Sequence, residues 1–179
     1  MFSIFKSTPK KVSLPLLTDI HSHLLPGLDD GVKTFEESWQ IVRRFQDLGY
    51  SKLITTPHIM NDYYRNTPAG IQAKKEELQV FLNQKNCMIQ LEAAAEYYLD
   101  ESLLQSVDNQ ELLLTFGTLR YLLFETNFLT EPYQLKDFIF KITTQRYKPV
   151  LAHPERYEYL NTNIDKLEDL RTRGVLFQL

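Results

Sequence analysis

Two histidines separated by a single residue are the first feature of this sequence that could do chemistry. His21 and His23 follow a short apolar run, and Asp30 comes from the loop after them, within residues 26–31. On a strand, residues two apart point to the same side, so the two imidazoles are expected to face the same way. Paired imidazoles with a carboxylate nearby are typical of a divalent metal site, although a hydrogen-bonded pair of surface histidines is an equally ordinary interpretation of this pattern alone.

The other candidate ligands each follow a further apolar run that is expected to form a strand. These runs and the residues after them are 52–56 with His58, 88–95 with Glu96, 121–124 with Glu125, and 149–152 with His153, while the first strand is expected over 14–21. All four histidines of the chain therefore lie near expected strand ends. Ordinary core packing would scatter some of them onto helices, so we expect these residues to share one site.

Helices are expected between these strands. The expected ranges are 34–49, 68–84, 100–109, 132–145 and 163–173, with a last strand over 175–179. Thr34 and Glu37 form a capping-box pattern at the start of the first helix, and Pro132 is expected in the first turn of the fourth. Alternating strands and helices predict an α/β fold with parallel strands, either an open doubly wound sheet or a (β/α) barrel. Only a barrel brings so many strand ends to one mouth, so we predict the barrel.

Composition limits the class of protein further. The chain has 179 residues, 43% of them hydrophobic and 24% charged, with a net charge of −3 and a single cysteine. We expect a flexible basic leader over 1–13 and one domain over 14–179. A net negative charge argues against nucleic acid as a partner, and a lone cysteine fits a reducing cytoplasm. The sequence has no run long and apolar enough for a membrane-spanning segment, so we expect a cytoplasmic protein.

Arg156 adds a second kind of chemistry to the expected site. Three carboxylates in one cleft repel each other unless cations lie among them, which predicts two or more divalent metals. Nitrogen and oxygen ligands without thiolate favour Mn, Fe or Zn. An arginine beside such metals offers a planar fork for phosphate oxygens, so the site predicts phosphoester hydrolysis, with Arg156 as the catalytic residue. The ordinary alternative for Arg156 is a surface ion pair with Glu155 or Glu158.

These motifs together resemble the polymerase and histidinol phosphatase (PHP) superfamily. The resemblance rests on 19–23 with 28–31, 55–58, 95–98, 124–125 and 152–157, in this order. Within that superfamily, the sequence is similar to bacterial manganese-dependent protein-tyrosine phosphatases of capsule and exopolysaccharide synthesis. The resemblance implies a distorted (β/α)7 barrel, a Mn²⁺ centre of two or three ions, and the phosphotyrosine tail of a partner tyrosine kinase as substrate. The ligands that it implies are His21, His23, Asp30, His58, Glu96, Glu125 and His153, and Arg156 would hold phosphate.

One departure from the family pattern concerns the end of the sequence. Family members continue beyond the position of Leu179 and supply a final Asp-x-His pair to the metal centre. We therefore expect a C-terminally truncated PHP domain, an unclosed barrel with an apolar edge, and a centre that lacks that pair. Two other functions stay open: a phosphatase for a small phosphoester such as histidinol phosphate, and a catalytically impaired binding protein of the same fold. A nucleic-acid 3′ end is disfavoured by the acidic charge.

Overall fold

The computed structural model describes residues 17–161 and 163–179. The expected leader 1–13 and the first residues of the expected strand 14–21 lie outside them. The strands are β1 (Thr18–Asp19), β2 (Lys52–Thr55), β3 (His58–Ile59), β4 (Gln90–Ala93), β5 (Glu96–Tyr98), β6 (Tyr121–Glu125), β7 (Lys148–Ala152) and β8 (Leu176–Gln178). The helices are α1 (Phe35–Leu48), α2 (Pro68–Gln84), α3 (Glu101–Asp108), α4 (Leu135–Thr144), the 3₁₀-helix η1 (Pro154–Arg156), α5 (Glu158–Asn161) and α6 (Ile164–Thr172).

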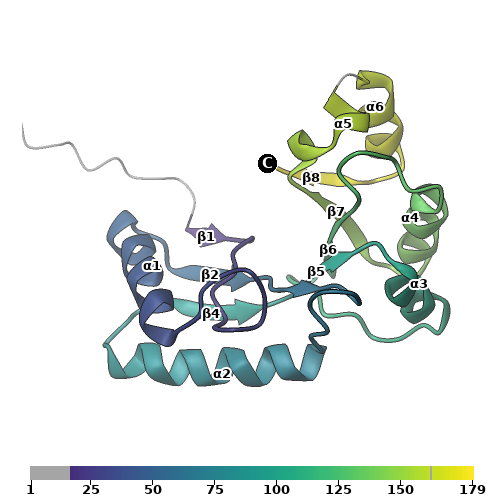
Figure 1. Ribbon diagram of the computed structural model, residues 1–179. Helices are drawn as coiled ribbons and strands as arrows, with labels where there is room; N and C mark the ends of the chain where they lie inside the picture. The colour runs from purple at the N-terminus through teal and green to yellow at the C-terminus, as the bar shows by residue number, and fades with distance from the viewer. Residues whose placement is uncertain (1–16, 162) are drawn as a thin grey trace, which may run out of the picture.

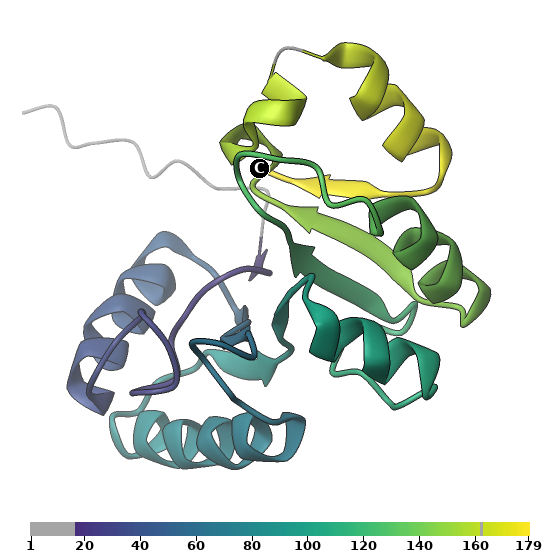
Figure 2. The ribbon, with the colours of Figure 1, turned by 45° about the vertical axis from the view of Figure 1, so that its right-hand side comes forward.

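The strands form two parallel sheets that follow one another around a common centre. Their orders are β1-β2-β4 and β3-β5-β6-β7-β8, and every pairing within them is parallel. If β2 with β3 and β4 with β5 are each counted as one interrupted strand, every strand pairs with the next one along the chain, as in a barrel. The helices lie on the outside of this curved arrangement (Figures 1 and 2). The predicted α/β barrel-type fold is confirmed. Among the described residues, no pairing joins β8 back to β1.

Two of the expected strands are each followed by a second, short strand. The expected strand 52–56 ends at Thr55, and β3 begins after it at His58. Within the expected strand 88–95 only Gln90–Ala93 forms β4, and β5 begins after it at Glu96. Proline has no N–H to donate, which accounts for the break at Pro57. Backbone bonds still cross the break, since Ala94 N donates to Thr55 O and Glu96 N donates to Pro57 O. His58 and Glu96 therefore open the second segments, and the prediction that they end strands is corrected.

Apolar side chains form two layers, one inside the curved sheet and one under the helices. The inner layer is small and includes Ile54, Leu123 and Val150. Their neighbours along the strands point the other way into the larger layer, where Leu53 and Leu122 pack among helix side chains. This alternation is the period of two that a strand buried on both faces requires. Side chains that follow the inner layer toward the strand ends are thereby directed into the mouth.

The helix ends match the sequence signals in part. Thr34 accepts a hydrogen bond from Glu37 N, and Gly49 closes α1 with a φ of 98°. The Glu37 side chain, however, accepts from Lys33 N instead of from the capping residue itself. The expected helix 132–145 begins only at Leu135, whose N–H donates to Pro132 O. Pro132 thus lies in the turn before α4 and not in its first turn, which corrects that prediction.

Between the expected strand 149–152 and the expected helix 163–173, the chain forms the two short helices η1 and α5. No helix of the described chain combines the length and the apolar character that crossing a membrane requires.

Candidate metal centre

All eight predicted site residues line one cleft of about 1040 Å³ at the mouth of the open barrel. They are His21, His23, Asp30, His58, Glu96, Glu125, His153 and Arg156. The segments that carry them lie far apart in the sequence and meet because parallel strands end on the same side of a sheet. The site is therefore a product of the topology, and the predicted convergence of these eight residues is observed.

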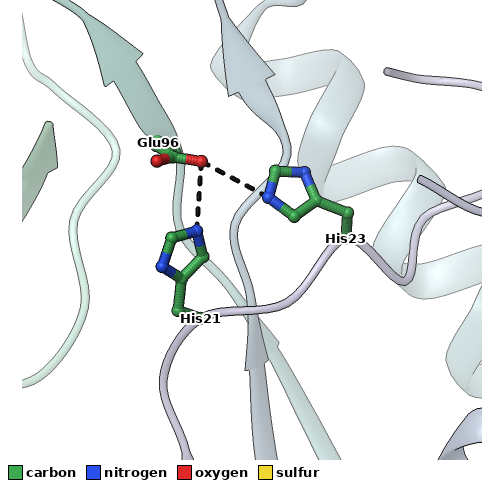
Figure 3. A group of neighbouring side chains, drawn as sticks. All are labelled: His21, His23 and Glu96. Carbon is green, nitrogen blue, oxygen red and sulfur yellow. Dashed lines mark hydrogen bonds and ion pairs between the residues drawn. The ribbon is translucent and has the colours of Figure 1, made fainter. Parts of the chain in front are cut away.

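Glu96 lies at the centre of the cluster. Its side chain is fully buried, and its Oε2 lies 3.1 Å from His21 Nε2, 3.3 Å from His23 Nε2 and 3.3 Å from His58 Nδ1. Figure 3 shows the first two of these contacts, with both imidazoles turned toward the same carboxylate. The other oxygen, Oε1, lies 2.9 Å from His153 Nε2. One carboxylate thus faces four imidazoles, the arrangement expected of a bridging metal ligand.

Glu125 and Asp30 complete the ring around His58. Glu125 comes two residues after Leu123 on β6, so its side chain points to the inside, where Oε1 lies 3.2 Å from His58 Nδ1. Asp30 Oδ1 lies 3.7 Å from His58 Nε2 and is the most exposed member of the group. Three sets of ligand atoms each gather within 4.8 Å: His21 with His23 and Glu96, His23 with Asp30 and His58, and His58 with Glu96 and Glu125.

The histidine tautomers test whether this group suits a cation. His23 Nδ1 lies 2.6 Å from Asp29 Oδ2, and an ionised carboxylate only accepts hydrogen bonds, so Nδ1 carries the proton. A neutral His23 then presents the lone pair of Nε2 to the Glu96 oxygen, which is also an acceptor. Two acceptors that face each other at 3.3 Å require a proton or a cation between them. The nitrogen and oxygen donors fit a divalent metal of the Mn, Fe or Zn type.

Without a metal, protons take the place of that cation. Burial disfavours the charged form of His23, but hydrogen bonds to Asp29 and Glu96 outweigh it and raise the pKa of His23 to about 10. Burial likewise favours the neutral form of Glu96, yet hydrogen bonds from His153, His21 and His23 hold its pKa well below the usual range. The metal-free cluster is therefore a set of buried ion pairs between imidazolium and carboxylate groups.

This predicts a stronger effect of pH on the stability of the metal-free chain than on that of the metal-loaded chain. A pKa raised above its unfolded value stabilises the fold below about pH 6.5, and this contribution is lost as the pH rises toward about 10. In excess chelator, we expect the melting temperature to fall from pH 6.5 upward. With saturating Mn²⁺ the fall should be smaller, because bound cations stabilise the fold and bind better to deprotonated ligands. Thermal melts at pH 6.5, 7.5 and 8.5 measure both series, and parallel curves would contradict the prediction.

The loop between His23 and Val32 is closed tightly enough to require glycine. Gly27 N donates to Val32 O, and Asp29 accepts from the backbone of Gly31 and His58 as well as from the His23 ring. A Cβ on Gly31 would lie 2.5 Å from His23 Cβ and from His23 O. Backbone atoms cannot move aside as a flexible side chain can.

Gly31→Ala is therefore expected to destabilise the fold by about 1–3 kcal/mol and to weaken cation binding, because it displaces His23. Thermal melts with and without Mn²⁺ measure both effects. Gly70→Ala is the matched control, because the added Cβ would meet a single side-chain atom, Thr67 Oγ1 at 3.2 Å, and no backbone atom of another segment. Equal melting temperatures for the Gly31 variant and the wild type would contradict the prediction, because the loop would then accommodate a Cβ at residue 31 without cost.

His153 reaches the cluster through a strained backbone conformation. Ala152 faces the inner layer, so a regular strand would turn the next side chain outward. His153 instead has a φ of 34° and ψ of 57°, and its N–H donates to Gln178 O at 2.7 Å. Left-handed conformations are costly for residues other than glycine and gather at functional sites. The strain here redirects one imidazole into the mouth.

Arg156 lies at the rim in η1, exposed to solvent. No ion pair from Arg156 to Glu155 or Glu158 is found among residues 17–161 and 163–179, so the structure gives no support to the alternative role of a surface salt bridge. Among the described residues, one arginine lines the cleft against six side-chain carboxylates, those of Asp30, Asp62, Glu96, Asp100, Glu125 and Glu155. Such a cleft repels an anion unless cations are bound in it, which again favours metals as part of the site.

Aromatic side chains flank the imidazoles on two sides. The Tyr64 ring is stacked on His58 with 5.5 Å between centroids and 13° between planes, and Phe128 meets His153 edge to face. Tyr63 and Tyr98 also line the cleft. Tyr97 does not, because it is buried under the helices and its hydroxyl accepts from Leu114 N. The aromatic side chains available to a ligand are therefore those of Tyr63, Tyr64, Tyr98 and Phe128.

Two supporting residues could not be found from the sequence. Asp29 is buried and holds the His23 ring, whereas its neighbour Asp30 lines the cleft. Two consecutive acidic residues are visible in the sequence, but their order does not show which one supports a histidine. Gln178 Oε1 lies 2.6 Å from His21 Nδ1. Nothing near Gln178 in the sequence marks it, because its partner is 157 residues away.

Comparisons with known proteins agree with this geometry. A family described as capsular polysaccharide synthesis, CpsB/CapC, matches residues 17–179. CapC of Staphylococcus aureus and the tyrosine-protein phosphatase YwqE of Bacillus subtilis are each 28% identical over 163 residues, 91% of this chain and 64% of theirs. The tyrosine-protein phosphatase CpsB of Streptococcus pneumoniae is 25% identical over 91% of this chain and 67% of its own. This chain thus spans less than two thirds of the length of CapC and YwqE.

A solved structure has the same fold. It comes from a study described as crystal structures of YwqE from Bacillus subtilis and CpsB from Streptococcus pneumoniae, unique metal-dependent tyrosine phosphatases. It superposes with a TM-score of 0.82 and 27% identity, covering 90% of this chain and 65% of the other.

Proposed function

Since this chain belongs to the capsular polysaccharide synthesis family CpsB/CapC, we propose that it is a metal-dependent phosphatase acting on phosphotyrosine in protein. The substrate we propose is the phosphorylated tail of a bacterial tyrosine kinase that controls capsule or exopolysaccharide synthesis. The site draws on elements from β1 to β8, so we further propose that residues 14–179 act as one domain.

The observation that carries the proposal is the position of Glu96 among four imidazoles. Its oxygens lie 2.9–3.3 Å from their nitrogens, and the tautomer of His23 leaves two acceptors face to face. We propose His21, His23, Asp30, His58, Glu96, Glu125 and His153 as ligands of two or three ions, with Mn²⁺ as the preferred metal. When bound, such ions offset phosphate charge and lower the pKa of a water molecule that attacks phosphorus.

The remaining residues supply orientation and a substrate slot. Arg156 is the only arginine or lysine among the described residues that line the cleft, and its planar fork suits two phosphate oxygens at once. Tyr63, Tyr64 and Phe128 offer aromatic faces to the ring of an aryl phosphate. This arrangement favours phosphotyrosine over a small alkyl phosphate such as histidinol phosphate.

The test combines metal content with turnover. The chain is stripped with chelator, reloaded with Mn²⁺ and analysed by mass spectrometry for metal per chain, and then assayed on p-nitrophenyl phosphate, a phosphotyrosine peptide, a phosphoserine peptide and histidinol phosphate. We expect two or more Mn²⁺ ions per chain and preferential hydrolysis of the two aryl phosphates. Metal uptake without turnover would favour a catalytically impaired binding protein over an enzyme. Equal rates on the aryl and alkyl phosphates would contradict the proposed preference for phosphotyrosine.

A further inference from the structure

Gln178, the last residue of β8, contacts two histidines that belong to opposite ends of the chain. Its Oε1 lies 2.6 Å from His21 Nδ1, and its backbone oxygen accepts from His153 N at 2.7 Å. The side chain is half-buried and lines the cleft. Through one residue, the strand that ends the described sheet is tied to the segment that follows β1.

The orientation of the Gln178 amide is determined by its other contact. Its Nε2 donates to the backbone oxygen of Leu179 at 2.8 Å, which leaves Oε1 to face His21. An amide oxygen only accepts hydrogen bonds, so His21 Nδ1 must carry a proton. The lone pair of a neutral His21 is then on Nε2, which lies 3.1 Å from Glu96 Oε2.

His21 and His23 are therefore held in the same tautomer by different partners. A carboxylate, Asp29, holds His23 at 2.6 Å, and a neutral amide, Gln178, holds His21 at the same distance. Both Nε2 atoms point to the same oxygen of Glu96, as Figure 3 shows. Hydrogen bonds to the far nitrogen of a ligating imidazole fix the ring and its tautomer, and they change metal affinity strongly.

We propose that Gln178 is a positioning residue for the cation site: its amide oxygen fixes His21 in the Nδ1-protonated tautomer and aims Nε2 at the cation. This rests on the proposed function, because it requires that the cluster binds a cation. In this role Gln178 acts through His21 and, by its backbone oxygen, through the strained His153.

The test uses Gln178→Met, which keeps the length of the side chain and removes the acceptor. Gln178→Glu restores an acceptor oxygen, Gln178→Asn keeps the amide but shortens its reach, and Gln90→Met replaces an exposed glutamine on β4 as the matched control. Titrations with Mn²⁺ should give about 10- to 100-fold weaker binding for the Met and Asn variants. The Glu variant should bind close to the wild type, and the Gln90 variant should be unchanged.

A spectroscopic measurement separates positioning from a general loss of structure. Long-range ¹H–¹⁵N spectra of the ¹⁵N-histidine-labelled chain loaded with diamagnetic Zn²⁺ report which ring nitrogen carries the proton. We expect a protonated Nδ1 and a zinc-bound Nε2 on His21 in the wild type and in Gln178→Glu, and loss of the zinc-bound Nε2 signal in Gln178→Met. Unchanged affinity and tautomer in both the Met and Asn variants would overturn the role of Gln178 alone. A wild-type chain that takes up no cation would overturn the proposed function and this inference together.

Discussion

Replacing Glu96 by glutamine is expected to abolish tight Mn²⁺ binding to this chain and, with it, phosphatase turnover. The substitution keeps the shape of the side chain but removes the negative charge that faces His21, His23, His58 and His153. It also replaces one ligand oxygen by an NH₂ group, which cannot bind a cation. We expect at least about 100-fold weaker binding, since loss of residues that merely support ligands already costs 10- to 100-fold.

Metal titration and p-nitrophenyl phosphate turnover measure this effect side by side. Glu92→Gln is the control, because Glu92 lies on the neighbouring β4 segment and pairs with Lys52 at the surface, outside the cleft. The control should bind Mn²⁺ and turn over substrate as the wild type does. If Glu96→Gln retained the full metal content, the central position of this carboxylate would have to be structural instead of metal-binding.

The second large effect is expected for Arg156→Ala, and it should affect turnover without affecting metal. Arg156 is exposed and outside the imidazole cluster, so its loss should leave the ligands in place. Removing one preorganised donor to a developing negative charge typically lowers kcat by about 100- to 1000-fold, and we expect a decrease of that order. Binding of inorganic phosphate to the Mn²⁺-loaded chain should weaken in parallel.

Two further variants make this result specific. Arg156→Lys keeps the charge but not the planar fork, so it should recover only part of the turnover. Arg171→Ala removes an exposed arginine of α6 that pairs with Glu168 and should have no effect. Loss of Mn²⁺ from the Arg156→Ala chain would contradict the assignment, because it would make Arg156 a support of the metal centre and not a phosphate ligand.

The sequence by itself determined the fold class and the members of the cluster. Apolar strands that alternate with helices can be buried on both faces only as a parallel arrangement, and parallel strands end on the same side. His21, Glu125 and His153 come at the ends of different apolar runs, so in a barrel they meet near one mouth. No tertiary information was needed for that step, because residue type and position relative to each strand were sufficient.

Only the tertiary structure decided how each member of the cluster is aimed and supported. Which of Asp29 and Asp30 turns inward depends on how the loop closes against His23, and this closure rests on contacts with Gly31 and His58 from a different strand. The break before Glu96, unlike that at Pro57, has no local signal and lies beside the Pro57 break in the neighbouring strand. Such choices are set by long-range packing and not by local propensity.

Gln178 is the clearest case of this limit. Its side chain contacts His21, which is 157 residues away in the sequence, only when the strands between them are paired as in the folded chain. No local sequence pattern near either residue therefore predicts the contact. The strain at His153 has the same origin, since the bond to Gln178 O helps hold a φ that the residue would not adopt alone. Residue type and spacing determined which side chains gather at the mouth of the barrel, whereas hydrogen-bond direction, tautomer and backbone strain were decided by contacts across the assembled sheet.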